Sequence, residues 1–362
     1  MRVLAVVLLL TLTLSGCLGG EARSEWAFEV TGLKDAYADG ARGKDVVVAV
    51  LDTGINVDHP SLDHLRDGKK GNGELIAYRD FMGTGRTVAD AADPNGHGTH
   101  VIGIMSARGS SFGDKLVNGG VDLLGASPGI QLAVAKVCDD EGCDPEILDD
   151  ALRWAIGRGA DIISLSLGGV ELGLIQTLQA PEQSRIQDAI RDAIDDAIDR
   201  GIVVVAAAGN EQDDGASDVA FPATIEGVIA VGAMDKAGNV AGFSNHGDSQ
   251  ANQCTGGGLF QSGRCHPHMK PELVAPGVGI LSAWSGDAYV RADGTSQATP
   301  FVTSVVALMI EASGPLDSRQ DVNVLKRALM DTAKPLDGQA RPHDNAAGYG
   351  VVQADAAIVA FS

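Results

Sequence analysis

The sequence predicts a doubly wound α/β fold, in which helices cover both faces of a mostly parallel central sheet. Short apolar runs of strand length recur along the chain, and amphipathic helical patterns lie between them. No proline- or serine-rich linker, internal repeat or low-complexity tract interrupts residues 25–362. We therefore expect these residues to form one domain.

Five apolar runs predict the strands of the sheet. The first, DVVVAVLD at 45–52, ends in a carboxylate. The others are QLAVAKV (131–137), ADIISLSL (160–167), GIVVVAAAG (201–209) and GVIAVGAM (227–234). Each run is continuous instead of alternating with polar residues, which is typical of parallel strands that are buried on both faces.

Helical patterns separate these strands. They are THVIGIMSA (99–107), PEILDDALRWAIGRG (145–159) and PEQSRIQDAIRDAIDDAIDRG (181–201). The third carries isoleucines at strict four-residue spacing: Ile186, Ile190, Ile194 and Ile198. This spacing forms one apolar stripe opposite acids and arginines, so we expect a surface helix packed on the sheet.

The first residues have the pattern of an export signal. Met1 and Arg2 precede thirteen mostly apolar residues, which is signal-peptide length and too short for a comfortable membrane span. The following LSGC, Leu14 to Cys17, resembles the lipobox of prokaryotic lipoproteins, in which the cysteine is lipidated. We predict that residues 1–24 are a signal peptide with a lipobox and a short linker. An ordinary secretory signal is the alternative, and both take the protein out of the cytoplasm.

Charge and cysteine content narrow the class further. The net charge of −21 argues against nucleic-acid binding, because a phosphate backbone needs a basic face. Beyond Cys17 the chain has four cysteines: Cys138, Cys143, Cys254 and Cys265. An exported chain with an even number favours disulfides. Of the three possible pairings we expect the local one, 138 with 143 and 254 with 265. Zinc bound by all four sulfurs is the alternative, although neither spacing is CxxC.

Polar residues stand where the predicted strands and helices begin or end. Asp52 ends the first strand, and Asn210 follows the fourth in AAAGN. His97 starts a helix in NGHGTHVIGIM, and its flanking glycines are expected to leave the imidazole exposed and open to another chain. Ser296 opens a helix in GTSQATP (294–300). Each residue has a structural explanation as a turn or cap, but functional groups also gather at the carboxyl ends of parallel strands.

Together these motifs resemble those of the subtilisin-like serine proteases. VAVLDTGI, NGHGTHV, SLSLGG, AAAGN and GTSQATP occur in the family's order, with KPELVAPG before the serine and GYGVVQADAA at the end. The resemblance covers residues 26–362. It implies a serine endopeptidase acting on proteins or peptides, with no cofactor needed for the chemistry.

The resemblance also assigns roles. Ser296 is the nucleophile, His97 takes its proton, and Asp52 orients the imidazole. The Asn210 side chain and the Ser296 backbone N–H form the oxyanion hole. A substrate strand pairs beside Ser166, Leu167 and Gly168. Another wall of the primary specificity pocket consists of Ala207, Ala208 and Gly209, with Ala220 near its base. Small residues there suggest room for a large apolar side chain.

The chain departs from the family at several positions. Gln297 replaces the usual methionine after the nucleophile, so we expect unusual tolerance of peroxide. Ser61 stands where calcium-binding members have an aspartate, so a structural calcium would need Asp63 or Asp122. Plain acidic loops are the reading we favour. The acidic loop CDDEGC (138–143) either favours basic substrate residues or is ordinary solvated surface.

Only residues 18–44 lie between the lipobox cysteine and the first predicted strand, which leaves no room for the family's inhibitory propeptide. We therefore expect the enzyme to fold unaided or with the help of a separate chain.

Two other functions compete with this one. An α/β-hydrolase esterase would show GxSxG and the order Ser, Asp, His, whereas this chain has the order Asp52, His97, Ser296. A catalytically silent binding lipoprotein would be expected to have lost one of these residues or Asn210. We expect a monomeric protease that touches a membrane only through a lipid at Cys17.

Overall fold

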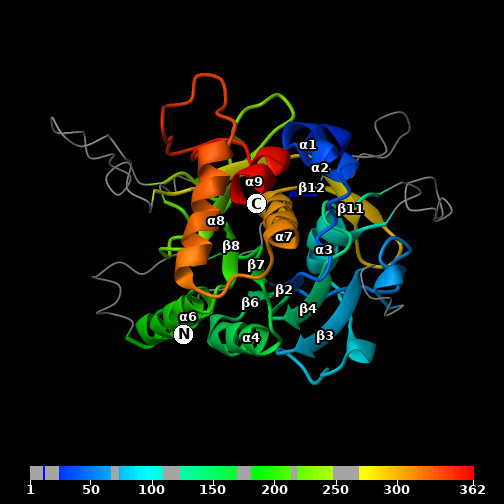
Figure 1. Cartoon of the computed structure of the whole chain (residues 1–362). Helices are drawn as coiled ribbons and strands as arrows, with labels where there is room; N and C mark the ends of the chain where they lie inside the picture. Colours follow the sequence, from blue (N-terminus) through cyan, green and yellow to red (C-terminus); the bar gives the residue numbers. More distant parts are fainter. Residues whose placement is uncertain are drawn as a thin grey trace.

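A computed structural model describes residues 11–12, 24–66, 73–108, 123–168, 181–212, 218–247 and 269–362. Its centre is a seven-stranded sheet in the order β10-β9-β8-β7-β2-β4-β3, parallel throughout (Figure 1). The strands are β2 (Val47–Asp52), β3 (Glu74–Asp80), β4 (Gln131–Lys136), β7 (Ile162–Leu165), β8 (Val203–Ala207), β9 (Ile229–Met234) and β10 (Leu273–Pro276). The predicted α/β class is confirmed.

The five predicted strands are the inner five of this sheet, and the two edge strands β3 and β10 are additional. Strand β3 alternates irregularly between buried and partly exposed residues, because an edge strand is covered less completely than a central one. Strand β10 has only four residues and ends in a proline, so it lacks the length of a typical strand signal.

Helices cover both faces of the sheet, as predicted. On one face α3 (His97–Ser106) contacts β2, and α7 (Thr295–Ser313) contacts β7, β8, β9 and β10 (Figure 1). On the other face α4 (Pro145–Gly157) contacts β2 and β4, and α6 (Pro181–Asp199) contacts β8. The isoleucine stripe of α6 faces inward: Ile190, Ile194 and Ile198 are buried, and Ile186 is partly buried against the core.

The remaining helices surround this layered centre. They are α1 (Glu25–Val30), α2 (Leu33–Ala38), α8 (Arg319–Thr332) and α9 (Ala354–Phe361), with 3-10 turns η1 (Asp63–Arg66) and η2 (Val88–Asp90). Helix α9 packs on α7 and α8, and α2 packs on α9. A helix from the first part of the chain and the last helix therefore pack against each other.

Two small antiparallel ladders complete the fold. Strands β11 (Ile280–Ala283) and β12 (Tyr289–Asp293) form a hairpin, and β1 (Thr11–Leu12) pairs with the other edge of β12. Strands β5 (Cys138–Asp139) and β6 (Gly142–Cys143) form a second, very short hairpin directly after β4. Because β12 runs straight into α7, the first hairpin sets where that helix begins.

The order of the strands creates a crevice for a site. Strands β4 and β7, which follow each other within this sheet, lie on opposite sides of β2. Such a switch of direction opens the carboxyl ends of the strands, and ligands bind there in open α/β sheets. Asp52 is the last residue of β2, and Ser166 directly follows β7.

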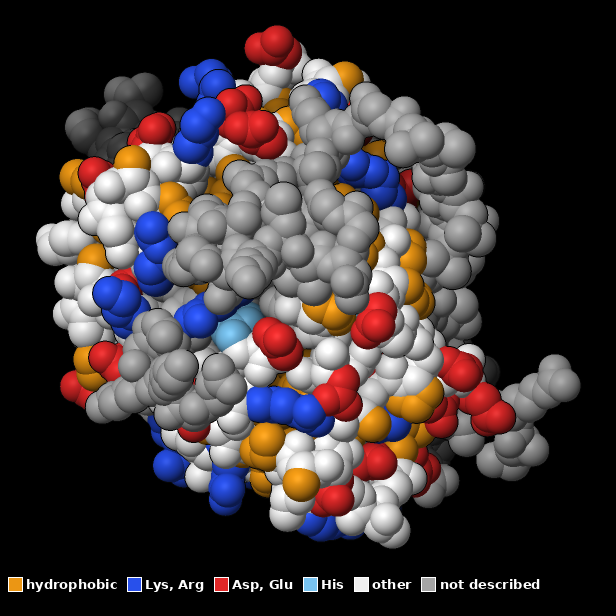
Figure 2. All heavy atoms as spheres, turned by 90° about the vertical axis from the view of Figure 1, so that its right-hand side faces the viewer, with side chains coloured by type: hydrophobic (Ala, Val, Ile, Leu, Met, Phe, Trp, Pro, Cys, Tyr) orange, Lys and Arg blue, Asp and Glu red, His pale blue; other side chains and the backbone are white. Residues whose placement is uncertain are grey.

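Figure 2 shows one side of the molecule, where acidic, basic and hydrophobic side chains are interspersed. In the described part of the chain the exposed large hydrophobic residues are Met82, Val324 and Val359, which lie far apart in the sequence. None of the helices that the structure describes combines the length and the apolar character needed to cross a membrane.

Candidate active site

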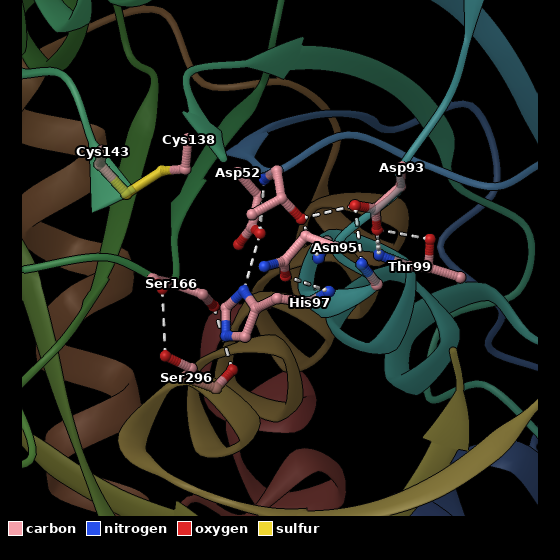
Figure 3. A network of polar contacts seen from close by, with 12 residues as sticks. Asp52, Asp93, Asn95, His97, Thr99, Cys138, Cys143, Ser166 and Ser296 are labelled. Carbon is pink, nitrogen blue, oxygen red and sulfur yellow. Dashed lines mark hydrogen bonds and ion pairs between the residues drawn. A yellow bond between two sulfur atoms is a disulfide. The ribbon is translucent and has the colours of Figure 1, made fainter. Parts of the chain in front are cut away.

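Asp52 and His97 form a buried pair at the crevice. Asp52 ends β2 and His97 begins α3, and the His97 Nδ1 lies 2.7 Å from the Asp52 Oδ1 (Figure 3). The backbone N–H of Thr53 donates to the same carboxylate oxygen at 2.7 Å. Among the described residues, neither the Asp52 Oδ2 nor the His97 Nε2 has a hydrogen-bond partner. The Nε2 atom is therefore available to another group.

The expectation that His97 is exposed is wrong, because its side chain is 0% exposed. The flanking glycines allow other segments of the same protein, not a second chain, to pack closely around His97. A Cβ on Gly96 would lie 2.7 Å from the Trp284 ring, and a Cβ on Gly98 would lie 2.3 Å from the Gly54 carbonyl oxygen. Gly96 also has a φ of 99°, a conformation that favours glycine.

The electrostatics of His97 favour its charged form. Burial lowers the pKa of the imidazole, but the charge and hydrogen bond of Asp52, with the charge of Asp93, raise it above its ordinary value of 6.5. A group placed to take up a proton and hold it next to a carboxylate has this character.

Ser296 lies beside this pair but bonds elsewhere. It is the second residue of α7, and in Figure 3 the imidazole of His97 lies between Asp52 and Ser296. The Ser296 hydroxyl donates to the Ser166 carbonyl oxygen at 3.0 Å instead of to His97. In return the Ser166 hydroxyl donates to the Ser296 carbonyl oxygen at 3.0 Å.

Pro300 explains why the Ser296 carbonyl accepts a side-chain donor. In an α-helix this carbonyl would accept the N–H of residue 300, which proline lacks. The Ser166 hydroxyl takes the place of the missing donor. The reciprocal pair thus joins the end of β7 to the first turn of α7.

Asn210 is held in place through its amide oxygen. Its Oδ1 accepts the Thr295 backbone N–H at 2.8 Å and the Thr295 hydroxyl at 2.9 Å. A Cβ built on Gly294 would lie 3.5 Å from the Asn210 Nδ2, which sets this donor beside the start of α7. The Ser296 N–H is one of the first four in α7, which have no carbonyl partner within the helix. The two donors therefore lie at the same helix end.

The residues expected to form the specificity pocket also come together. The Ala220 N–H donates to the Ala208 carbonyl oxygen at 2.7 Å. A Cβ on Gly168 or on Gly209 would lie 3.0 Å from the Ala220 Cβ, so these two glycines allow their backbones to pack closely on Ala220. Leu167, Ala207 and Ala208 are buried, so backbone atoms are what they can offer to a substrate strand.

The β5–β6 hairpin, which contains a disulfide, is linked to the start of α3 by hydrogen bonds. The structure contains the bridge between Cys138 and Cys143, the first expected pair, whereas Cys254, Cys265 and Cys17 lie outside the described residues. Asp140 accepts a hydrogen bond from the Asn95 side chain at 2.8 Å. Asn95 in turn accepts the His97 N–H at 3.0 Å.

The position considered for calcium is used for other contacts. The buried Ser61 hydroxyl lies 2.8 Å from the Tyr289 hydroxyl, and its N–H donates to the His59 Nδ1 at 3.1 Å. Asp63 lies in η1, and Asp122 lies outside the described residues. Within the described ranges, no three His, Cys, Asp or Glu side chains are grouped as metal ligands.

Sequence reasoning missed the residues that surround this site. The clearest is Asp93, a buried carboxylate four positions before His97 that hydrogen-bonds to Thr53 and Thr99. The signal available in the sequence was an aspartate followed by Pro-Asn-Gly just before a helix, which is typical capping and turn chemistry.

Comparison with known proteins agrees with this geometry. The sequence model of the Subtilase family matches residues 43–350. Subtilisin BL of Lederbergia lenta is 32% identical over 92% of this chain and 97% of its own. Subtilisin DY of Bacillus licheniformis is 31% identical over 83% of this chain and 87% of its own. The major intracellular serine protease of Bacillus subtilis (strain 168) is 32% identical over 84% of this chain and 82% of its own. The chain therefore belongs to the subtilase family and is a serine endopeptidase.

Proposed function

We propose that this enzyme hydrolyses peptide bonds in proteins and peptides through Asp52, His97 and Ser296, by way of an acyl-enzyme. The observation that carries the proposal is the buried Asp52–His97 pair. The His97 Nε2 has no hydrogen-bond partner among the described residues and lies on the side of Ser296 (Figure 3). The carboxylate can only accept, so the Nδ1 atom carries the hydrogen and the Nε2 atom keeps its lone pair. His97 is thereby set up as a general base.

The Ser296 hydroxyl must turn before it reacts. In this structure it donates to the Ser166 carbonyl, and proton transfer requires it to donate to the His97 Nε2. A substrate strand lying beside residues 166–168 would bring its own backbone N–H to that carbonyl. Substrate binding would then displace the serine hydroxyl toward the base, which couples binding to activation of the nucleophile.

The oxygen of the attacked carbonyl becomes negative in the tetrahedral intermediate. The Asn210 Nδ2 and the Ser296 N–H would donate to it, and the helix dipole of α7 favours an anion there. Thr295 fixes the other end of the Asn210 amide, so the donor is oriented before substrate arrives. Loss of such a donor costs about 100- to 1,000-fold in rate, a magnitude established in subtilisin.

The experiment is active-site labelling of the purified full chain. We expect a fluorophosphonate probe to label the wild type and not Ser296→Ala, and the wild type to cleave unfolded casein. His97→Ala should also abolish labelling, whereas Ser313→Ala, in the last turn of the same helix, should not. Intact casein together with no labelling of the wild type would reject the proposal.

We also propose that the protein is exported and held to a membrane as a lipoprotein through Cys17. Its support is the sequence LSGC after an apolar segment of signal length. In a host that lipidates such proteins, we expect Cys17→Ala either to appear in the medium instead of the membrane fraction or to keep its uncleaved signal peptide. A wild type found in the soluble fraction would reject the anchor, and size-exclusion chromatography in detergent would test the expected monomer.

A further inference from the structure

The loop before α3 contains a carboxylate that the proposed mechanism does not use. Asp93 is 5% exposed, although burying a carboxylate is costly unless its oxygens are hydrogen-bonded. Figure 3 draws it in the same network of polar contacts as Asp52 and His97.

Both oxygens of Asp93 are fully occupied by donors. The Oδ1 accepts the Thr53 hydroxyl at 2.8 Å and the Gly96 N–H at 2.9 Å. The Oδ2 accepts the N–H of Thr99 at 2.8 Å and its hydroxyl at 2.6 Å. Three of these four bonds come from the first turn of α3 or its N-cap, where the helix has no acceptors of its own.

Thr53 extends the contacts of Asp93 to the end of β2. While its hydroxyl donates to Asp93, it accepts the Gly98 N–H at 2.8 Å. Its own N–H donates to Asp52 at 2.7 Å. One short chain of hydrogen bonds thus runs from the carboxylate at the end of β2, through Thr53 and Asp93, to the residues on both sides of His97.

Asp93 also has an electrostatic role. A negative charge near a helix N-terminus is stabilised by the helix dipole, and the N-cap residue Gly96 has no side chain to supply one. The same charge acts on His97: after the opposing effect of burial and the larger effect of Asp52, Asp93 contributes to raising its pKa.

We propose that Asp93 is a positioning residue of this protease, which with Thr53 holds Asp52 and His97 in register and stabilises the imidazolium formed during acylation. The inference rests on the proposed function of His97 as the base. Because Asp93 hydrogen-bonds to Thr53, Gly96 and Thr99, it acts on Asp52 and His97 through these neighbours.

Few other titratable groups face His97. Asp52 comes from β2, Asp93 from the loop before α3, and His100 from the next turn of α3 itself. Burial, together with nearby His97, lowers the pKa of His100 to about 3, so it is uncharged at neutral pH. The other elements packed on α3 present uncharged groups near the site, Ser296 from α7 and Ser282 from β11. Lys136 of β4 reaches the Thr53 carbonyl oxygen.

The test is the pH profile of Asp93→Asn, which keeps the size of the side chain and removes its charge. Asp93 raises the pKa of His97, so its loss should lower that pKa and move the acidic limb of kcat/KM to lower pH. We expect the plateau kcat to fall about 10- to 100-fold with a smaller change in KM, because small misplacements of catalytic groups are costly in rate. Asp90→Asn is the matched control, since Asp90 is an exposed carboxylate that bonds within its own turn.

A second pair of variants covers the case in which Asp93→Asn does not fold. Thr53→Val removes one hydroxyl at nearly constant shape and should lower kcat about 10-fold, whereas Thr53→Ser keeps the hydroxyl and should stay near the wild type. If the wild type is labelled by fluorophosphonate while folded Asp93→Asn keeps its pH profile and kcat, the inference fails and the proposed function stands. Equal activity of Thr53→Val and Thr53→Ser would overturn it likewise. An unlabelled wild type would instead reject the proposed function.

Discussion

Gln297, the residue after the nucleophile, is expected to resist oxidation at a cost to the stability of the fold. Its side chain is 0% exposed, and neither amide atom has a hydrogen-bond partner among the described residues. A buried amide without partners costs roughly 1–3 kcal/mol. Methionine would fill similar space without that cost, but its sulfur can be oxidised next to Ser296.

We therefore expect Gln297→Met to raise the free energy of unfolding by about 1–3 kcal/mol and to make the enzyme sensitive to peroxide. The wild type should keep its activity over a peroxide exposure that inactivates the variant. Residual activity measured over time in peroxide tests the expected sensitivity, and urea unfolding of both proteins tests the expected change in stability. Rapid inactivation of the wild type, with the variant no worse, would contradict the expectation.

The first turn of α7 depends on a residue from another element. Because Pro300 has no N–H, the Ser296 carbonyl relies on the Ser166 hydroxyl that follows β7. The helix that carries the nucleophile is thus aligned by the strand that is expected to bind substrate.

Removing this hydroxyl should misalign the nucleophile. We expect Ser166→Ala to lower kcat about 10-fold, because it leaves a buried carbonyl without a donor. In a Pro300→Ala background the new N–H of residue 300 can bond to the same carbonyl, so the further loss from Ser166→Ala should be clearly smaller. A double-mutant cycle in kcat measures this coupling. Strictly additive effects would show that the two groups do not serve the same carbonyl.

The β5–β6 hairpin carries several acids, and most of them already have structural partners. Asp139 accepts the Glu141 N–H, Asp140 accepts Asn95, and Asp144 caps α4. Asp140 and Glu141 remain exposed, so the hairpin keeps negative charge near the crevice.

If this hairpin borders the bound substrate, peptides with Lys upstream of the scissile residue should be cleaved up to about 5-fold faster than peptides with Ala. The advantage should shrink in high salt, because exposed charges are screened. The ratio of kcat/KM for the two peptides at low and high salt measures it, and Glu141→Gln should reduce it. A ratio that does not depend on salt or on Glu141 would assign the acids to solvated surface.

At the scale of the whole molecule, a buried charge cluster joins the last part of the chain to the sheet. The Oε1 of Glu272, just before β10, forms ion pairs with Lys270 at 3.1 Å and with Lys326 of α8 at 2.6 Å. Its other oxygen accepts the Ala230 N–H of β9, and both lysines donate to the Val228 carbonyl. All three side chains are buried.

Breaking this cluster should destabilise the entire fold. We expect Glu272→Gln to cost about 3–5 kcal/mol, because it leaves buried ammonium groups without their counter-charge. Asp196→Asn, which removes an exposed pair with Arg200, should cost less than about 1 kcal/mol. Urea unfolding at neutral pH measures both. Equal small losses would mean that the buried cluster contributes little.

The same cluster predicts the direction of acid unfolding. Burial raises the pKa of Glu272, but Lys270 and Lys326 outweigh it, so its folded pKa lies below the ordinary value of 4.5. Its stabilisation is present above the unfolded pKa and is lost as pH falls through the folded one. Glu272→Gln should therefore weaken the dependence of stability on pH below about 4.5.

The sequence by itself determined the five inner strands, the helices between them and the family, because buried strands and amphipathic helices are local patterns of apolar residues. It also identified Asp52, His97, Asn210 and Ser296 as residues at the ends of elements. Only the tertiary structure decided which groups these side chains touch. The residues of the Asp93–Thr53 contact lie 40 positions apart in the sequence, and those of the Ser166–Ser296 pair lie 130 apart. The burial of His97 likewise depends on segments from elsewhere in the chain. Such contacts depend on how the strands are ordered in the sheet, and no local pattern of residues encodes that order.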